Sequence, residues 1–169
     1  MPDHQWLLFM TRYNAWQNDL MRQALEALPP KVVSSDRGAF FGSMLGTVNH
    51  ILWADQMWMS RFAGWPKPEC GLDQSPELTR SVGAWSAERS RLDGHLSDWA
   101  AGVDHVALSG ELRWVSGATG AQMSRPMSLC VAHMFNHQAH HRGQVHSMVT
   151  GAGAKGWLSD LAFLPELST

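Results

Sequence analysis

Residues 126–150 read PMSLCVAHMFNHQAHHRGQVHSMVT and contain five of the nine histidines of the chain. Apolar residues recur in this stretch every three or four positions, which is the period of one face of an α-helix. The positions on that face are Cys130, Met134, His137, His141, Val145 and Met148. Two histidines therefore stand in the middle of an apolar stripe, and such a stripe packs against the core of a helical protein.

Three earlier segments show the same period and predict further helices. They span residues 5–28, 40–62 and 76–100. The first ends at a pair of prolines and the second at a stretch rich in glycine and proline, because neither residue type continues a helix readily. Ser75 followed by Pro76 is typical of a helix start and is predicted to begin the third segment. The apolar face of the first segment is predicted to comprise Trp6, Met10, Tyr13, Leu20, Ala24 and Leu28.

The connection before the last helix has a different pattern. Residues 106–115 and 121–125 partly alternate between polar and apolar side chains, which favours a β-hairpin. The predicted fold class is therefore all-α: a four-helix bundle with a short irregular or β-hairpin excursion before the last long helix. Residues 1–169 are expected to form a single domain.

Composition and charge exclude several classes of partner. Basic and acidic residues number 13 and 15, a formal net charge of −2, so no polycationic surface is available for nucleic acid or an anionic membrane. No stretch approaches the roughly 18 apolar residues that a membrane-spanning helix needs, and the N-terminus lacks the pattern of a signal peptide. Cys70 and Cys130 have no C-x-x-C spacing and suggest no disulfide framework. We expect a cytoplasmic protein.

The histidine pair in the last helix has the spacing of a metal site. His137 and His141 lie about 40° apart around the helix axis and one turn apart along it, so both rings can reach one ion. Buried imidazoles must be hydrogen-bonded or bound to metal, and hydrogen bonding alone is the alternative. Divalent zinc, nickel, iron or copper accepts imidazole nitrogen, and three protein ligands would leave a position open for water or substrate. His50, the only histidine in residues 40–62, is the predicted third ligand.

Other residues near this pair have roles that the sequence leaves open. His133 could be a fourth ligand, which would favour a structural metal site, or could pack against the hairpin. His140 is expected to contact another helix or a subunit. Arg142 could bind an anionic group of a substrate or pair with another helix or subunit. Gly143 disfavours a helix by about 1 kcal/mol relative to alanine, which indicates either a close approach by another group or simple tolerance. Polar side chains elsewhere that could orient the imidazoles are Asn14, Asn49 and Asp55.

The motif NHQAHHRGQ at residues 136–144, together with HILWAD at residues 50–55, resembles the damage-inducible DinB/YfiT-like family of metal-binding four-helix bundles. The resemblance extends over essentially the whole chain, including the order of helices and the irregular segment before the last one. It implies that His50, His137 and His141 are the metal ligands, with zinc, nickel or iron as the ion.

Two functional hypotheses follow from this resemblance. In the first, the protein is a metal-dependent enzyme that activates a thiol or water, like a thiol S-transferase or a hydrolase, and acts on a low-molecular-weight thiol or another small molecule. In the second, the metal fastens two helices of a non-catalytic dimeric bundle that serves as a stress-related binding or structural module. A homodimer is expected in both cases. No catalytic residue can be assigned, since H-E-x-x-H, G-x-S-x-G and nucleotide-binding glycine motifs are all absent from the sequence.

Overall fold

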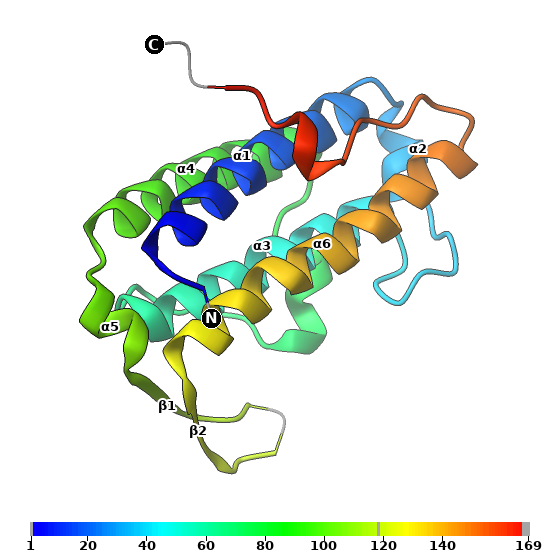
Figure 1. Cartoon of the computed structure of the whole chain (residues 1–169). Coiled ribbons are helices and arrows are strands. Elements are labelled where there is room, and N and C mark those ends of the chain that lie inside the picture. The colour runs from blue at the N-terminus through cyan, green and yellow to red at the C-terminus, as the bar shows by residue number, and fades with distance from the viewer. Residues whose placement is uncertain (1, 118, 167–169) are drawn as a thin grey trace.

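A computed structural model of the chain describes residues 2–117 and 119–166 (Figure 1). The long helices are α1 (His4–Glu26), α3 (Met44–Phe62), α4 (Val82–Gly102) and α6 (Met127–Gly151). The shorter helices are α2 (Pro30–Ser34), α5 (His105–Ser109) and the 3-10 turns η1 (Leu72–Glu77) and η2 (Leu161–Phe163). Strands β1 (Glu111–Val115) and β2 (Gln122–Pro126) lie between α5 and α6.

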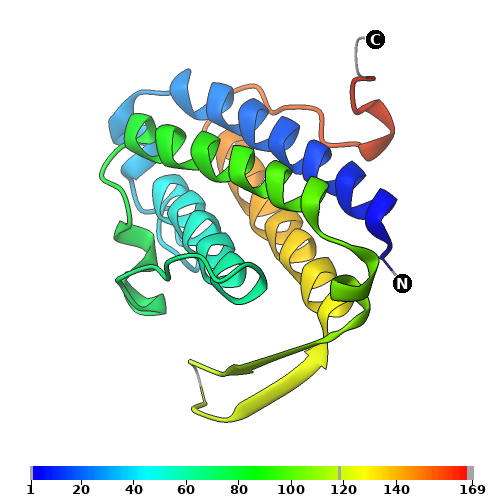
Figure 2. The same ribbon diagram turned by 90° about the vertical axis from the view of Figure 1, so that its left-hand side faces the viewer.

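The long helices form a bundle of two packed pairs. Helix α1 lies beside α4, and α3 lies beside α6 (Figures 1 and 2). Contacts of α1 with α6 and of α3 with α4 join the two pairs. The predicted all-α four-helix bundle is thus confirmed. Within the described part of the chain, no helix combines the length and apolar character needed to cross a membrane.

Serine side chains determine where two of the long helices begin. The hydroxyl of Ser43 accepts the backbone N–H three residues later, so α3 starts after this residue rather than at residue 40. The hydroxyl of Ser81 caps α4 in the same way. The prediction that Ser75 begins this helix is wrong, because Ser75 lies in η1, where its hydroxyl donates to Leu72 O at 2.7 Å.

The predicted β-hairpin is confirmed, but it begins later than expected. Strands β1 and β2 pair antiparallel, with Trp114 opposite Met123. Residues 106–109 are helical instead of extended, because the Asp104 side chain accepts a hydrogen bond from Ala107 N at 2.7 Å and starts α5. Residue 118, in the hairpin connection, lies outside the described residues. The hairpin projects from the end of the bundle where α6 begins (Figure 1).

The core contains two apolar clusters separated by a polar band. One cluster includes Met21, Leu52, Trp85 and Val145, and the other includes Leu7, Met59, Leu96 and Phe135. Along α1, α3 and α6, buried polar side chains lie between the two clusters, and Arg89 on α4 joins them through its ion pair with Asp55; the polar residues include Asn14, Asp55, Arg89, Gln138 and Arg142. The predicted apolar face of α1 is wrong. Of the six predicted positions only Tyr13 is buried, and the other buried residues of this helix are Leu7, Thr11, Asn14, Gln17, Asn18, Met21 and Leu25.

Candidate metal centre

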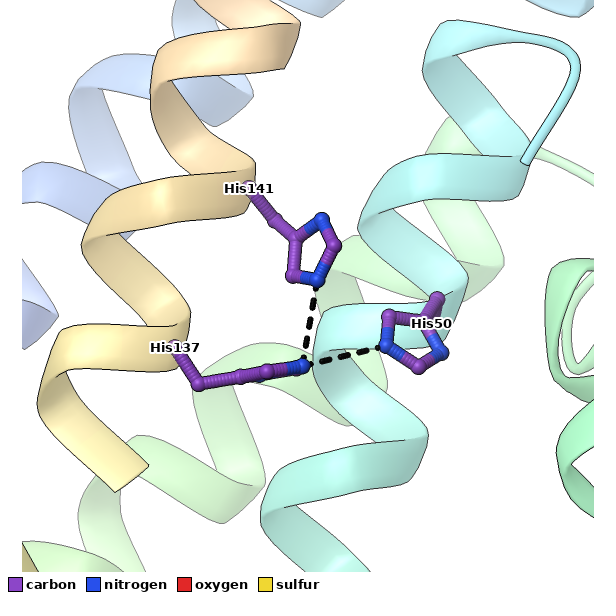
Figure 3. A group of neighbouring side chains, drawn as sticks. All are labelled: His50, His137 and His141. Atoms are coloured by element: carbon purple, nitrogen blue, oxygen red, sulfur yellow. Dashed lines mark hydrogen bonds between the residues drawn. The ribbon is translucent and has the colours of Figure 1, made fainter. Parts of the chain in front are cut away.

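Three imidazole rings meet between α3 and α6. His50 comes from the middle of α3, and His137 and His141 come from successive turns of α6 (Figure 3). Nε2 of His137 lies 3.2 Å from Nε2 of His50 and 3.1 Å from Nε2 of His141. One nitrogen from each ring lies within 4.8 Å of the other two. The structure therefore brings together the three residues that the sequence predicts as ligands.

Packing restricts the orientation of these rings. His50 and His141 are nearly enclosed, with exposed fractions of 4% and 8%. Phe41, in the turn before α3, stacks on His50 with ring centroids 3.8 Å apart and an interplanar angle of 18°. The same phenylalanine meets His141 edge-on at 5.4 Å. Because one aromatic ring touches two of the imidazoles, the turn that ends at Ser43 is part of the site.

Ser75 determines which nitrogen of His50 carries the proton. Its hydroxyl lies 3.0 Å from Nδ1 of His50 and donates its own proton to Leu72 O. A hydroxyl that already donates elsewhere can only accept from the ring, so Nδ1 of His50 is protonated. Nε2 of His50 is then an unprotonated nitrogen directed at the other two rings (Figure 3).

Gln144 does the same for His141. Nδ1 of His141 lies 2.8 Å from Oε1 of Gln144, and the amide nitrogen of Gln144 faces His140 Nε2 at 3.3 Å. An amide oxygen only accepts hydrogen bonds, so Nδ1 of His141 is the protonated nitrogen and its Nε2 is free. Two neutral rings therefore point unprotonated nitrogens at the same place.

This donor set is compatible with a divalent metal ion. Nε2 of His137 could donate a proton to His50 or to His141, but one proton does not satisfy both lone pairs well. A divalent ion would accept the lone pairs of all three Nε2 atoms. Nδ1 of His137 is buried and has no hydrogen-bond partner among the described residues, so this ring lacks the orienting contact that the other two possess.

Burial keeps the three imidazoles in their neutral form. It lowers the pKa of His50 to about 3 and the pKa of His137 to about 4, and repulsion between the rings, were they charged, acts in the same direction. Burial also lowers the pKa of His141, although its hydrogen bond to Gln144 opposes this shift. Near neutral pH the rings are therefore in the form that coordinates metal ions.

The histidine cluster forms one wall of a pocket of about 510 Å³. Its other walls are largely aromatic, and the lining residues include Phe40, Phe41, Trp53, Met57, Trp58, Arg61 and His133. A pocket of this size is suitable for a small organic molecule. A larger depression of about 900 Å³ lies around Trp65, Cys70 and His95 and includes none of the three clustered histidines.

His133 and His140 lie beside the cluster without joining it. The ring of His133 packs 5.3 Å from Trp58 and 5.9 Å from His137, centroid to centroid. The ring of His140 lies 4.8 Å from His141 and contacts Gln144 on its own helix. Among the described residues, neither has a nitrogen within the group that could share one ion. The alternative of four histidine ligands therefore finds no support.

Arg142 and Gly143 play no part in the pocket. Arg142 is buried in the bundle and donates to Asn14 Oδ1 at 2.5 Å and to Gln138 Oε1 at 3.0 Å, so it joins helices rather than facing a substrate. A Cβ atom at Gly143 would meet nothing within 4 Å in the described structure. The close approach predicted there is wrong, and the helix simply tolerates the glycine.

The three polar residues expected to orient the imidazoles have other partners. The amide of Asn49 donates to the backbone oxygens of residues 76 and 79, at 2.8 and 2.9 Å, and so fixes η1 beside His50. Asn14 receives the hydrogen bond from Arg142. Asp55 accepts hydrogen bonds from Arg89, at 2.6 Å, and from Gln138. The sequence had therefore indicated polar residues near the site, but not their contacts.

Sequence reasoning missed the roles of Ser75 and Gln144, whose oxygens accept hydrogen bonds from Nδ1 of His50 and of His141. Gln144 could have been found, because a residue three positions after His141 lies on the same side of a helix. Ser75 is 25 residues from His50, in a short turn without periodicity, and its place beside His50 is visible only in the folded chain.

The fold and the cluster define a class of protein: a helical bundle with a three-histidine cluster, compatible with a metal ion, between two of its helices. The model of the DinB family matches residues 1–167, and the chain belongs to this family. The crystal structure of a DinB-like protein from Bacillus cereus ATCC 10987 has a similar fold, with a TM-score of 0.63 and 19% sequence identity over 85% of this chain and 90% of that chain. No curated protein matches the sequence.

Proposed function

We propose that this protein binds one divalent metal ion, zinc, nickel or iron, through Nε2 of His50, His137 and His141. The observation that carries the proposal is the convergence of three Nε2 atoms, two of them on rings whose Nδ1 protons are held by Ser75 and Gln144. Imidazole ligands in proteins are typically oriented by such contacts at the other ring nitrogen. Membership of the DinB family supports the same assignment.

We further propose that the protein is an enzyme acting on a small molecule. A divalent ion held by three histidines acidifies a bound water or thiol and so supplies a nucleophile near neutral pH. The protein contributes three neutral ligands, a wall of aromatic side chains that limits water, and a pocket of about 510 Å³ at the cluster. A low-molecular-weight thiol is the proposed co-substrate in a thiol S-transferase-like reaction, and water takes that place in a hydrolase-like reaction.

Metal content tests the site directly. Protein purified without chelator should hold about one transition-metal ion per chain, as three-histidine sites do. His50→Ala and His137→Ala should lose it, while His105→Ala, an exposed histidine on α5, should retain it. A parent protein that stays metal-free when zinc, nickel and iron are each offered would overturn the proposal, and so would a His50→Ala protein that binds as well as the parent.

Activity separates the enzyme from a metal-stabilised module. Metal-loaded protein should transfer a small thiol to an alkylating electrophile, or hydrolyse an activated ester, and His137→Ala should do neither. A protein that binds metal tightly, melts at a higher temperature with it and catalyses no reaction would favour the non-catalytic bundle. The expected homodimer stays a prediction, which light scattering on purified protein checks.

A further inference from the structure

One permanent positive charge lies in the wall of the pocket, on Arg61. This residue is close to the C-terminal end of α3 and lines the same pocket as the three histidines. Its guanidinium lies 4.6 Å from the ring centroid of Trp58 and 5.5 Å from that of Trp114 on β1. Cation–π contact with these rings holds the flat guanidinium group in place. Its N–H groups lie around the rim of the guanidinium plane and stay available as hydrogen-bond donors.

Within the part of the chain that the structure describes, no acidic group pairs with this charge. Among the described residues, Arg61 has no hydrogen-bond acceptor and no carboxylate partner, and no aspartate or glutamate lines the pocket. The thiol of Cys130 lies close enough to interact electrostatically with Arg61, but burial keeps this thiol neutral by raising its pKa. Burial lowers the pKa of Arg61, but a guanidinium remains charged at any physiological pH. A half-buried arginine without an anion is thus part of the pocket.

The distance between Arg61 and the histidines indicates the shape of a ligand. Arg61 follows His50 by three turns of α3, about 16 Å along the helix axis between Cα atoms. Side chains in a helix lean toward its N-terminus, so the guanidinium reaches back toward the cluster. Trp53, Met57 and Trp58 line the wall between the two. A molecule that reaches from the histidines to Arg61 must therefore be longer than an inorganic anion and apolar in its middle.

We infer that the pocket binds a small carboxylate-bearing molecule with an apolar or aromatic body, whose carboxylate pairs with Arg61 while its reactive end lies at the three histidines. The inference rests on the proposed function only for the reactive end, because the pairing with Arg61 needs no metal. Guanidinium and carboxylate form charge-assisted, two-pronged hydrogen bonds, and the aromatic walls suit an apolar body.

The test compares 4-phenylbutyrate with its neutral counterpart 4-phenylbutyramide by calorimetric titration. Each is added to protein in its metal-loaded form and after chelator treatment. The parent should bind the carboxylate about tenfold more tightly than the amide, as expected for a charge-assisted pairing that is partly open to solvent. Arg61→Gln should abolish this preference in both forms and leave amide binding unchanged. Arg113→Gln, which removes an exposed charge next to Trp114, should keep it.

Equal binding of the two probes by the parent would overturn the inference. A preference that survives Arg61→Gln would overturn it too, because the carboxylate would then bind elsewhere, for instance on the metal. If Arg61→Gln fails to fold, the side-chain Nε–H resonance of Arg61 in the parent decides: it should shift with the carboxylate and not with the amide. Loss of metal binding would contradict only the proposed function and not this inference, because the preference for the carboxylate over the amide is also measured in chelator-treated protein.

Discussion

At the scale of single residues, Ser75 shows how an uncharged side chain can orient a histidine of the proposed metal site. Its hydroxyl holds the Nδ1 proton of His50 and so leaves Nε2 free. Ser75→Ala should weaken metal binding by at least about tenfold, the loss typical when a contact that orients a histidine ligand is removed. Ser97→Ala, an exposed serine on α4, is the matched control and should bind as the parent does.

Competition with a chromophoric chelator measures the affinities of both serine variants. The melting temperature of each metal-free protein is recorded beside them, because a change in affinity at constant stability separates orientation of His50 from damage to the fold. An unchanged affinity in Ser75→Ala would show that packing against Phe41 is enough to orient the ring.

The depressed pKa values of the histidines predict how acid affects the metal-free protein. The pKa of His50 is about 3 in the fold against 6.5 for an ordinary histidine, so this ring stays neutral where the unfolded chain takes up a proton. Its contribution to stability is present above pH 6.5 and is lost as the pH falls toward 3. Asp55 acts in the opposite direction, because burial raises its pKa from 3.8 to about 6.

The contribution of Asp55 cancels when the parent is compared with a variant of His50, because both proteins contain Asp55. Between pH 6.5 and 5, metal-free parent should lose about 1.6 kcal/mol more of its unfolding free energy than His50→Gln, since the slope for one shifted group is half its limit at pH 6.5 and approaches that limit, about 1.4 kcal/mol per pH unit, as the pH falls. Urea titrations at several pH values give the two curves. His105→Gln should follow the parent, and parallel curves for parent and His50→Gln would contradict the assigned pKa.

At the scale of elements, the period of a helix is predictable from the sequence and the chemistry of its buried face is not. The last helix was placed to within one residue at each end, from 126–150 to Met127–Gly151. The predicted face of α1 missed the buried apolar residues Leu7, Met21 and Leu25, because the buried positions between them carry the polar Asn14, Gln17 and Asn18 and interrupt the apolar pattern. Those polar residues are buried because they hydrogen-bond to partners on other helices or in the segment after α6, and the identity of such partners is a property of the packed fold.

The polar band predicts a large effect at Asp55. This carboxylate on α3 accepts from Arg89 on α4 and Gln138 on α6, and Arg89 also pairs with Asp93 at 2.8 Å. Asp55→Ala would remove one of the two carboxylates that pair with the buried guanidinium of Arg89. It would also leave the amide of Gln138 without its acceptor. We expect the free energy of unfolding to fall by about 3 kcal/mol, the order found when one member of a buried ion pair is removed.

Denaturant unfolding of metal-free protein measures this loss, and an exposed pair on α1 provides the control. Glu26→Ala removes one of the two carboxylate partners of Arg22 at the surface, where such a contact contributes only a few tenths of a kcal/mol. Similar small changes in both variants would mean that Asn and Gln side chains, rather than the ion pair, hold the band together.

At the scale of the whole molecule, the order of helices was predictable because each helix carries its own periodic signal. Segments that hold the bundle together without such a signal were not. The turn η1 places Ser75 against His50, and the chain after α6 crosses back over α1 (Figure 1). Both contacts join residues far apart in the sequence, so no local sequence pattern predicts them.

Trp157 connects the end of the chain to its beginning. Its indole N–H donates to Oε1 of Gln17 at 3.1 Å, while the amide of Gln17 donates to Leu158 O at 3.0 Å. One helical turn before Gln17 on α1, the hydroxyl of Tyr13 donates to Ser159 O of the same segment. Because Gln17 is 1% exposed, the tail supplies the hydrogen-bond partners that water cannot.

Trp157→Ala should therefore lower the unfolding free energy by about 2 kcal/mol, from lost apolar contact and an unpaired buried oxygen on Gln17. Trp157→Phe keeps the ring contact and should lower it by only about 1 kcal/mol, the part due to Gln17. Neither variant should change metal content, because Trp157 lies outside the pocket lined by the three histidines. Metal loss in the phenylalanine variant would mean that the tail and the histidine cluster are coupled through α6, where His146 contacts Trp157 O at 3.2 Å.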